Sequence, residues 1–172
     1  MNIREALIKE HSKRQCNRIV DYVGNDKKRF AELIILMLTD EYRIAQRAAW
    51  PVSYCIQKND RLIQPWFGKM INKLQELNIH DAIKRNTLRV MQDLCIPEKH
   101  CGVLYDICYA YLHSIKEPIA IRVFALSVLS NIAQKHPELK IEVIHDAENF
   151  LHCGIPALES RSRKVLKQFK DV

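Results

Sequence analysis

The sequence predicts an all-α protein built from repeated pairs of helices. Three observations support this prediction: apolar residues recur every three or four positions, breaks fall at regular intervals, and turn-forming residues are few. The chain has 172 residues, 48% of them hydrophobic, with only 4 Gly and 6 Pro. An all-β domain of this length would need many more turn residues. The length suits one domain with a substantial core, so we expect residues 1–172 to form a single domain.

The first 25 residues are expected to cap the repeats with one or two helices within residues 2–23. Ser12 is placed to cap the second of these helices, because its hydroxyl can accept a hydrogen bond from a free backbone N–H. Gly24 and Asn25 end that helix, and Asp26 caps the next one.

A repeat of 37 residues begins after this cap. Three sets of apolar residues recur at that step: Phe30, Phe67, Leu104 and Ile141; Leu33, Met70, Ile107 and Ile144; and Ile34, Ile71 and Cys108. Three apolar columns with one period indicate a repeated helix whose core face is the same each time. The columns predict first helices at 27–38, 64–77, 99–114 and 139–152.

A second helix is expected after each first helix, at 42–58, 81–96, 118–135 and 156–170. Pro118 and Pro156 fall in the first turn of a helix, where a missing N–H costs nothing. Pro97 and Pro137 follow the predicted ends of second helices, where proline stops a helix. Pro51 lies inside a second helix and predicts a bend there.

Helix pairs repeating at this period resemble HEAT or armadillo-type repeats. The segment DEYRIAQRAA, residues 40–49, is similar to the HEAT pattern of an acidic turn, an aliphatic residue, an Arg and small residues. Those roles fall on Asp40 or Glu41, Ile44, Arg47, and Ala48 with Ala49. The resemblance covers residues 26–170 and implies an α-α superhelix, a right-handed solenoid of about four helix pairs.

The resemblance also implies a ladder of arginines, each paired with a carboxylate in the preceding turn. Arginines recur at Arg47, Arg85, Arg122 and Arg161. Asp40 or Glu41, Asp81 and Glu117 precede the first three as such pairs require. A second alignment, which matches Ser53 with Ser130 and Gln57 with Gln134, fits the polar faces of the helices better. The sequence leaves the alignment of the second helices open between these two.

The basic residues are concentrated on the predicted second helices. These helices hold 13 of the 27 Lys and Arg residues but only 3 of the 20 Asp and Glu residues, in a chain of net charge +7. In HEAT-like solenoids the second helices line the concave surface, so the resemblance implies a basic concave face. The alternative is that these cations are structural, in ion pairs and at helix ends.

One side of helix 42–58 carries Arg43, Arg47, Trp50 and Tyr54, a combination that can anchor a partner side chain or stack on a base. The predicted partner-binding residues are Arg43, Arg47, Trp50, Tyr54, Arg85, Arg89, Lys164 and Lys167. Alternatively, Trp50 packs against the neighbouring second helix. Trp66 is expected to cover a seam between helices, without a function.

No catalytic, metal-binding or cofactor-binding motif is present, so we expect no enzyme activity, metal or cofactor. The neighbouring His and Cys residues lack the spacings that place two ligands on one side. The six cysteines are expected to be reduced thiols. Asp81, Asp93 and Glu159 are the carboxylates of the second helices that could act as an acid or base.

Function is therefore predicted as a non-enzymatic scaffold that binds another, acidic protein on its concave basic face. The alternative is a nucleic-acid binder similar to the bacterial HEAT-like glycosylases that remove alkylated purines, with Trp50, Arg47 and Asp81 in the cleft. The charged N-terminus and the short apolar stretches predict a cytoplasmic protein without a signal peptide or membrane span. A monomer or weak dimer is expected.

Overall fold

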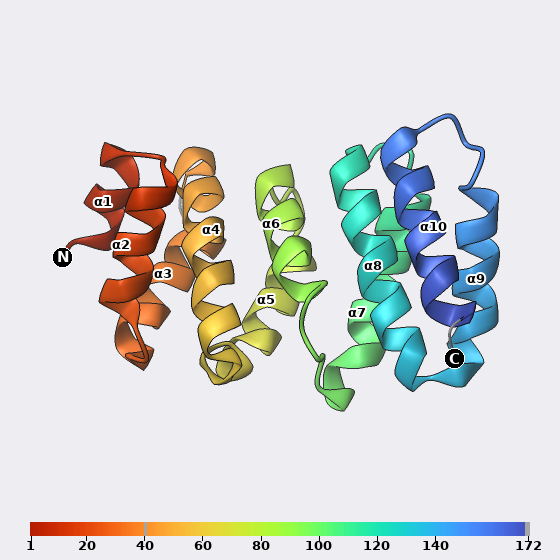
Figure 1. Ribbon diagram of the computed structural model, residues 1–172, viewed down its shortest axis with the longest axis horizontal. Helices are drawn as coiled ribbons and strands as arrows, with labels where there is room; N and C mark the ends of the chain where they lie inside the picture. The colour runs from red at the N-terminus through yellow and green to blue at the C-terminus, as the bar shows by residue number, and fades with distance from the viewer. Residues whose placement is uncertain (40, 171–172) are drawn as a thin grey trace. The chain divides into compact units, whose positions relative to one another are not determined.

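The computed structural model describes residues 1–39 and 41–170, and in that part the chain is all-α, as predicted (Figure 1). The α-helices are α1 (Ile3–Lys9), α2 (Lys13–Val23), α3 (Lys27–Thr39), α4 (Tyr42–Lys58), α5 (Phe67–Leu74), α6 (Asp81–Met91), α7 (Glu98–His113), α8 (Ile119–Lys135), α9 (Lys140–Asn149) and α10 (Pro156–Lys170). Three short 3-10 helices join them: η1 (Asp60–Leu62), η2 (Gln64–Trp66) and η3 (Pro137–Leu139).

The chain forms two compact units, Met1–Val90 and Met91–Val172. The first unit contains α1 to α6, apart from the last residue of α6, and the second contains α7 to α10. That the whole chain is one domain stays a prediction. No helix in the described ranges combines the length and the apolar character that a bilayer crossing requires.

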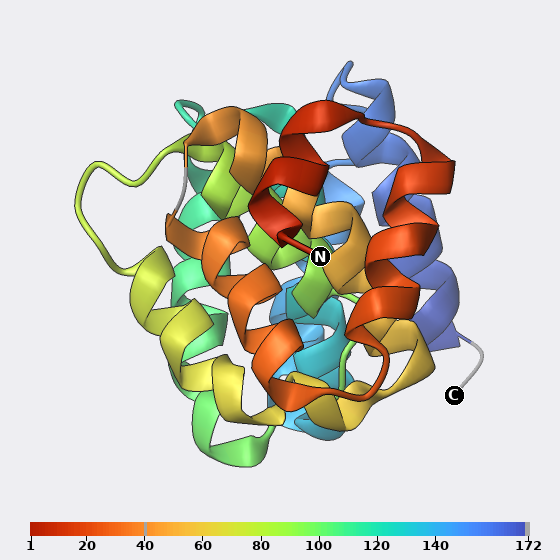
Figure 2. The same cartoon turned by 90° about the vertical axis from the view of Figure 1, so that its left-hand side faces the viewer.

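The N-terminal cap consists of two helices, α1 and α2, which contact α3 and α4 (Figure 2). Asn2 caps α1 by accepting a hydrogen bond from Glu5 N at 3.1 Å, and Ser12 caps α2 by accepting one from Gln15 N at 3.1 Å. The sequence predicted the Ser12 cap. Gly24, with φ at 50°, ends α2 in the left-handed region that glycine enters without strain.

The core of the first unit follows the predicted columns. Phe30 and Leu33 of α3, with Phe67 and Met70 of α5, are fully buried at 0% exposure. Asp26 caps α3 by accepting hydrogen bonds from Lys28 N and Arg29 N, as expected from the sequence. These bonds lower the pKa of the Asp26 carboxyl, because they favour its charged form.

Several helix boundaries differ from the prediction, most of all in α5 and α6. The segment that contains Pro65 forms η2, so α5 begins at Phe67 and ends at Leu74 instead of spanning 64–77. Helix α6 ends at Met91, five residues before the predicted end at residue 96. Pro51 lies within α4, which runs continuously from Tyr42 to Lys58.

The apolar columns change register in the second unit. Ile141, predicted to be buried, is 80% exposed, and α9 instead buries Val143 and Ala147. These two residues follow Leu104 and Cys108 of α7 by 39 positions, not 37. The helical turn η3 precedes α9 and accommodates this longer step. The predicted column was therefore wrong for its fourth member.

Candidate partner-binding surface

Helix α4 presents the predicted stripe of basic and aromatic side chains on one side. Arg43 is exposed, whereas Trp50 and Tyr54 are half-buried, with ring centroids 6.5 Å apart. Their spacing of four residues on a helix brings the two rings together. The aromatic pair therefore offers a partly exposed apolar patch beside a cation.

Trp50 also packs within its own unit. Its indole lies 5.5 Å from the His11 ring in an edge-on arrangement, between α4 and the turn that joins α1 to α2. The hollow beside it, which Ser12 and Arg47 also line, has a volume of only about 10 Å³. Intramolecular packing and residual exposure therefore coexist at Trp50, and this region is a surface and not a ligand cavity.

Arg47 contacts the end of a helix. Its Nη1 donates hydrogen bonds to Leu7 O at 2.8 Å and to Ile8 O at 2.9 Å, two carbonyls in the last turn of α1. Such carbonyls have no partner within their own helix. Of the two acidic residues expected to pair with Arg47, Asp40 lies outside the described residues, and Glu41 lies 4.0 Å from Arg4. Arg47 thus fastens the N-terminal cap to α4.

Arg122 of α8 also bonds the end of a helix, but the helix is α7, which directly precedes its own. Its Nε donates to Leu112 O at 2.8 Å, in the last turn of α7, and its guanidinium lies 5.5 Å from the centre of the Phe150 ring. The residue is only 9% exposed. The hydrogen bonds described for Arg47 and Arg122 thus go to carbonyls at helix ends, which differs from the ladder of turn carboxylates that the resemblance implied.

Helix α6 contributes the remaining basic candidates of the first unit. Arg89 is exposed and Arg85 is half-buried. The buried Asn86 donates from Nδ2 to Ala45 O at 3.4 Å, and this bond holds α6 beside α4. Arg43, Trp50, Tyr54, Arg85 and Arg89 therefore belong to two neighbouring helices of one unit. Lys164 and Lys167 are exposed on α10, in the second unit.

The carboxylates considered as acids or bases have structural partners. Asp81 Oδ1 lies 3.8 Å from Lys84 Nζ, one turn along α6. Glu159 Oε1 accepts a hydrogen bond from Gly154 N at 3.0 Å, which fastens the turn before α10. Asp93 is exposed beyond the end of α6. None of these contacts joins a carboxylate to a nucleophile.

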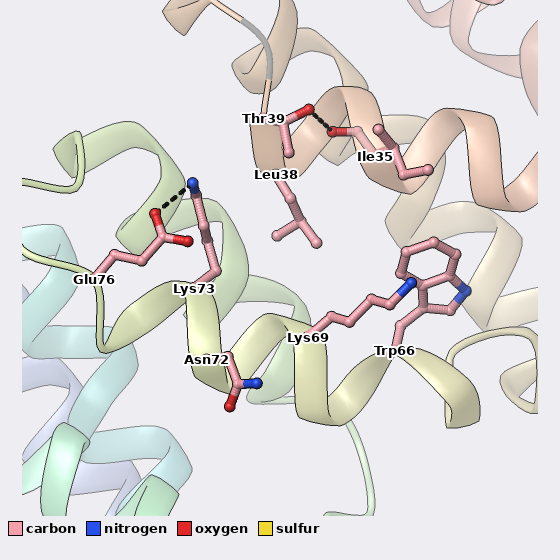
Figure 3. Close-up of a pocket in the computed structure, with 8 residues that line it drawn as sticks. All are labelled: Ile35, Leu38, Thr39, Trp66, Lys69, Asn72, Lys73 and Glu76. Carbon is pink, nitrogen blue, oxygen red and sulfur yellow. Dashed lines mark hydrogen bonds and ion pairs between the residues drawn. The ribbon is translucent and has the colours of Figure 1, made fainter.

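A pocket that the sequence did not indicate lies between α3 and the segment from η2 to α5 (Figure 3). It has a volume of about 340 Å³ and is lined by Ile35, Leu38, Thr39, Trp66, Lys69, Asn72, Lys73 and Glu76. Lys69 Nζ lies 4.5 Å from the centre of the Trp66 ring, and Lys73 Nζ lies 2.6 Å from Glu76 Oε2. Trp66 thus lines a pocket. The sequence feature that could have indicated this pocket is Ile35, an isoleucine outside the three apolar columns, which is 45% exposed in the structure.

Burial makes several cysteines unsuitable as nucleophiles. It raises the pKa of Cys16 to about 11 and that of Cys55 to about 12, so both remain protonated thiols at neutral pH. Burial also raises the pKa of Cys108. Among the described residues, Glu98, Cys101 and His136 of the second unit are the group that could hold a metal ion together.

Comparison with known proteins gives one match to a family and none to an individual curated protein. The model of the HEAT repeat domain family matches residues 3–169, which covers nearly the whole chain, the two cap helices included. No curated protein matches the sequence. The match agrees with the helix pairs and with the resemblance seen in residues 40–49. The chain belongs to the HEAT repeat domain family.

Proposed function

We propose that this protein is a non-enzymatic HEAT-repeat module that binds an acidic segment of another protein through the exposed side of α4 and α6. The observation that carries the proposal is the combination on two adjacent helices of exposed Arg43 and Arg89 with the half-buried pair Trp50 and Tyr54. Aromatic and arginine side chains dominate the energetics of protein interfaces. HEAT repeats typically mediate protein interactions through such surfaces.

The charge distribution supports an acidic partner. Within their observed bounds, α4 and α6 together carry six Lys and Arg residues and one acidic residue, Asp81. Arg47 is engaged at the end of α1, which leaves Arg43, Arg85 and Arg89 as the arginines directed at a partner. Electrostatic complementarity of this kind speeds encounter and selects against basic partners.

A scaffold is favoured over an enzyme because the candidate acids have structural contacts. Asp81 pairs with Lys84, and Glu159 fastens the turn before α10. Family membership is compatible with a scaffold, since HEAT repeats need only a shaped surface to bind. We also propose that the module works in the cytoplasm as a monomer or weak dimer.

Fluorescence anisotropy tests the proposal with three labelled probes: a short Glu- and Leu-rich peptide, the same peptide with Lys in place of Glu, and a short DNA duplex. We expect the acidic peptide to bind at low salt and the basic one not to bind. Reversal of two charges, Arg43→Glu with Arg89→Glu, should weaken binding about tenfold. The matched control is Lys27→Glu, an exposed reversal at the start of α3, which should leave binding unchanged.

Three other results would overturn parts of the proposal. Preference for the duplex over the acidic peptide would make the protein a nucleic-acid binder. Loss of peptide binding in Trp66→Ala, but not in Trp50→Ala with Tyr54→Ala, would move the site to the pocket between α3 and α5. Loss only in Lys164→Glu with Lys167→Glu would move it to α10 of the second unit.

A further inference from the structure

A histidine, a cysteine and a glutamate meet at the junction of α7 and α8 in the second unit. Glu98 and Cys101 lie in the first turn of α7, and His136 follows the last residue of α8. One ligand atom from each residue lies within 4.8 Å of the other two. We propose that these three side chains bind a zinc ion, which would fasten the start of α7 to the end of α8.

The spacing along α7 explains why two of the ligands share a side. Glu98 and Cys101 are three residues apart on the helix, which places their side chains next to each other. His136 is brought to them by the antiparallel return of α8 along α7. Sequence spacing compares only His and Cys residues that are neighbours in the chain, and it missed this arrangement because His136 follows a different helix.

The ligand types select zinc over other common divalent ions. A thiolate, an imidazole and a carboxylate together suit the borderline-soft Zn²⁺, whereas Mg²⁺ and Ca²⁺ prefer oxygen ligands alone. Ligand atoms around a tetrahedral zinc lie about 3.5 Å apart. His136 Nε2 and Glu98 Oε1 are 3.3 Å apart, so this pair already has the separation that zinc requires.

The hydrogen bonding of His136 leaves one ring nitrogen available for a cation. Its Nδ1 lies 3.4 Å from Glu138 Oε1, and its Nε2 lies 3.3 Å from Glu98 Oε1. With the proton on Nδ1, the ring donates to Glu138 and the buried Nε2 carries a lone pair. Its lone pair faces the Glu98 carboxylate, which is an unfavourable arrangement unless a positive charge lies between them. Carboxylate support of a zinc-bound histidine is a recurrent feature of zinc sites.

Cys101 is available to the same cation. Its thiol is 3% exposed and makes only long hydrogen bonds, with Sγ 3.8 Å from Ile96 O and 3.6 Å from Pro97 O. Zinc binding would release the thiol proton and replace weak sulfur hydrogen bonds with a metal–thiolate bond.

Lys135, the last residue of α8, is a cation whose charge acts on Cys101, and it has other partners. Lys135 Nζ donates to Cys95 Sγ at 2.8 Å and to Ile96 O at 3.3 Å. With Cys101 ionised, the two anionic ligands balance the charge of Zn²⁺, and Lys135 stays bonded to Cys95. Three protein ligands leave a fourth position of the tetrahedron for solvent.

Metal binding by the reduced full-length chain tests the proposal. Protein freed of metal by a chelator is titrated with Zn²⁺ against a chromophoric indicator, and with Co²⁺ as a spectroscopic substitute. We expect one equivalent to bind, with a thiolate-to-cobalt charge-transfer band in the near ultraviolet. Zinc should also raise the melting temperature by about 5 °C.

Matched variants decide which residues bind the ion. Cys101→Ser should abolish the cobalt band and His136→Asn should lower zinc affinity at least tenfold. Cys95 is a neighbouring exposed thiol outside the group, so Cys95→Ser should keep both the cobalt band and the zinc affinity. Glu98→Gln changes a side chain that is 75% exposed, so it should fold normally and still bind zinc more weakly than the wild type. Absence of zinc binding in the wild type would overturn the proposal. So would zinc affinities in Glu98→Gln and His136→Asn that equal that of the wild type.

Discussion

Arg47 of α4 and Arg122 of α8 are matched in one of the two alignments of the second helices, and both use the guanidinium group to bond the end of another helix. Each donates a hydrogen bond of 2.8 Å to a carbonyl in the last turn of another helix, Leu7 O for Arg47 and Leu112 O for Arg122. They differ in burial: Arg122 is 9% exposed, whereas Arg47 is half-buried and one of its two bonds is exposed.

The surroundings of the two arginines extend this difference to whole helices. On α8, Ser127 and Ser130 are buried, and Ser130 Oγ donates to Gln168 Oε1 at 2.9 Å, so this polar side packs against α10. On α4, Trp50 and Tyr54 remain half-exposed. An arginine that bonds the end of a helix can thus be part of the core in one unit and border a surface in the other. Burial, and not the sequence motif, separates the structural arginine from the one beside a candidate binding surface.

The largest effect is expected for Arg122→Ala, which should lower the free energy of unfolding by about 3 kcal/mol. The change removes a charge-assisted hydrogen bond, leaves Leu112 O without that partner in a buried setting, and removes packing against Phe150. Urea unfolding measures it. Arg122→Lys is the matched control and should recover part of the loss. A loss below about 1 kcal/mol would show that burial does not make the difference.

Arg47→Ala should cost less, about 1 kcal/mol, because water can replace the guanidinium at the exposed Ile8 carbonyl. The same urea measurement applies. Arg43→Ala, four residues earlier on α4 and exposed, is the control and should change stability by less than about 0.5 kcal/mol. If Arg47→Ala were as destabilising as Arg122→Ala, the contrast between the two sites would be wrong.

Most of the fold followed from periodicity, because each helix must bury one apolar side. The columns through Phe30, Phe67 and Leu104 are buried as predicted. The column failed at Ile141, where η3 adds a short turn before α9 and lengthens the last step by two residues. A fixed period carries no information about such an insertion. The column of Ile34, Ile71 and Cys108 would continue to the polar residue His145, and this break in the column was a sign of it.

The candidate sites were less predictable because they depend on contacts between segments far apart in the sequence. The exposure of Arg43 and the pairing of Trp50 with Tyr54 followed from helical spacing. The contact of Arg47 with α1 joins residues 40 positions apart. The approach of His136 to Glu98 and Cys101 required the three-dimensional fold. Helix geometry predicts neighbours on one helix, whereas contacts between helices depend on packing.

The smallest expected effect concerns local opening of the first unit, which its buried thiols can report. Burial raises the pKa of Cys16 and Cys55 above the ordinary value of 9.0, to about 11 and about 12. Their burial therefore stabilises the fold below pH 9, and this contribution is lost as the pH rises through those values. At about pH 8 both thiols are protonated and react only when the unit opens.

Arg47→Ala should raise the labelling rate of Cys16 and Cys55 about fivefold, because weaker attachment of α1 by about 1 kcal/mol increases the open population by that factor. Peptide-resolved mass spectrometry of pulse-labelled protein measures each cysteine separately. Cys108, fully buried in the second unit, should keep its rate, and exposed Cys95 should react at once in every variant. Equal acceleration of Cys16, Cys55 and Cys108 would show that the chain opens as one cooperative domain. The two units would then differ in the burial of their arginines but not in how they open.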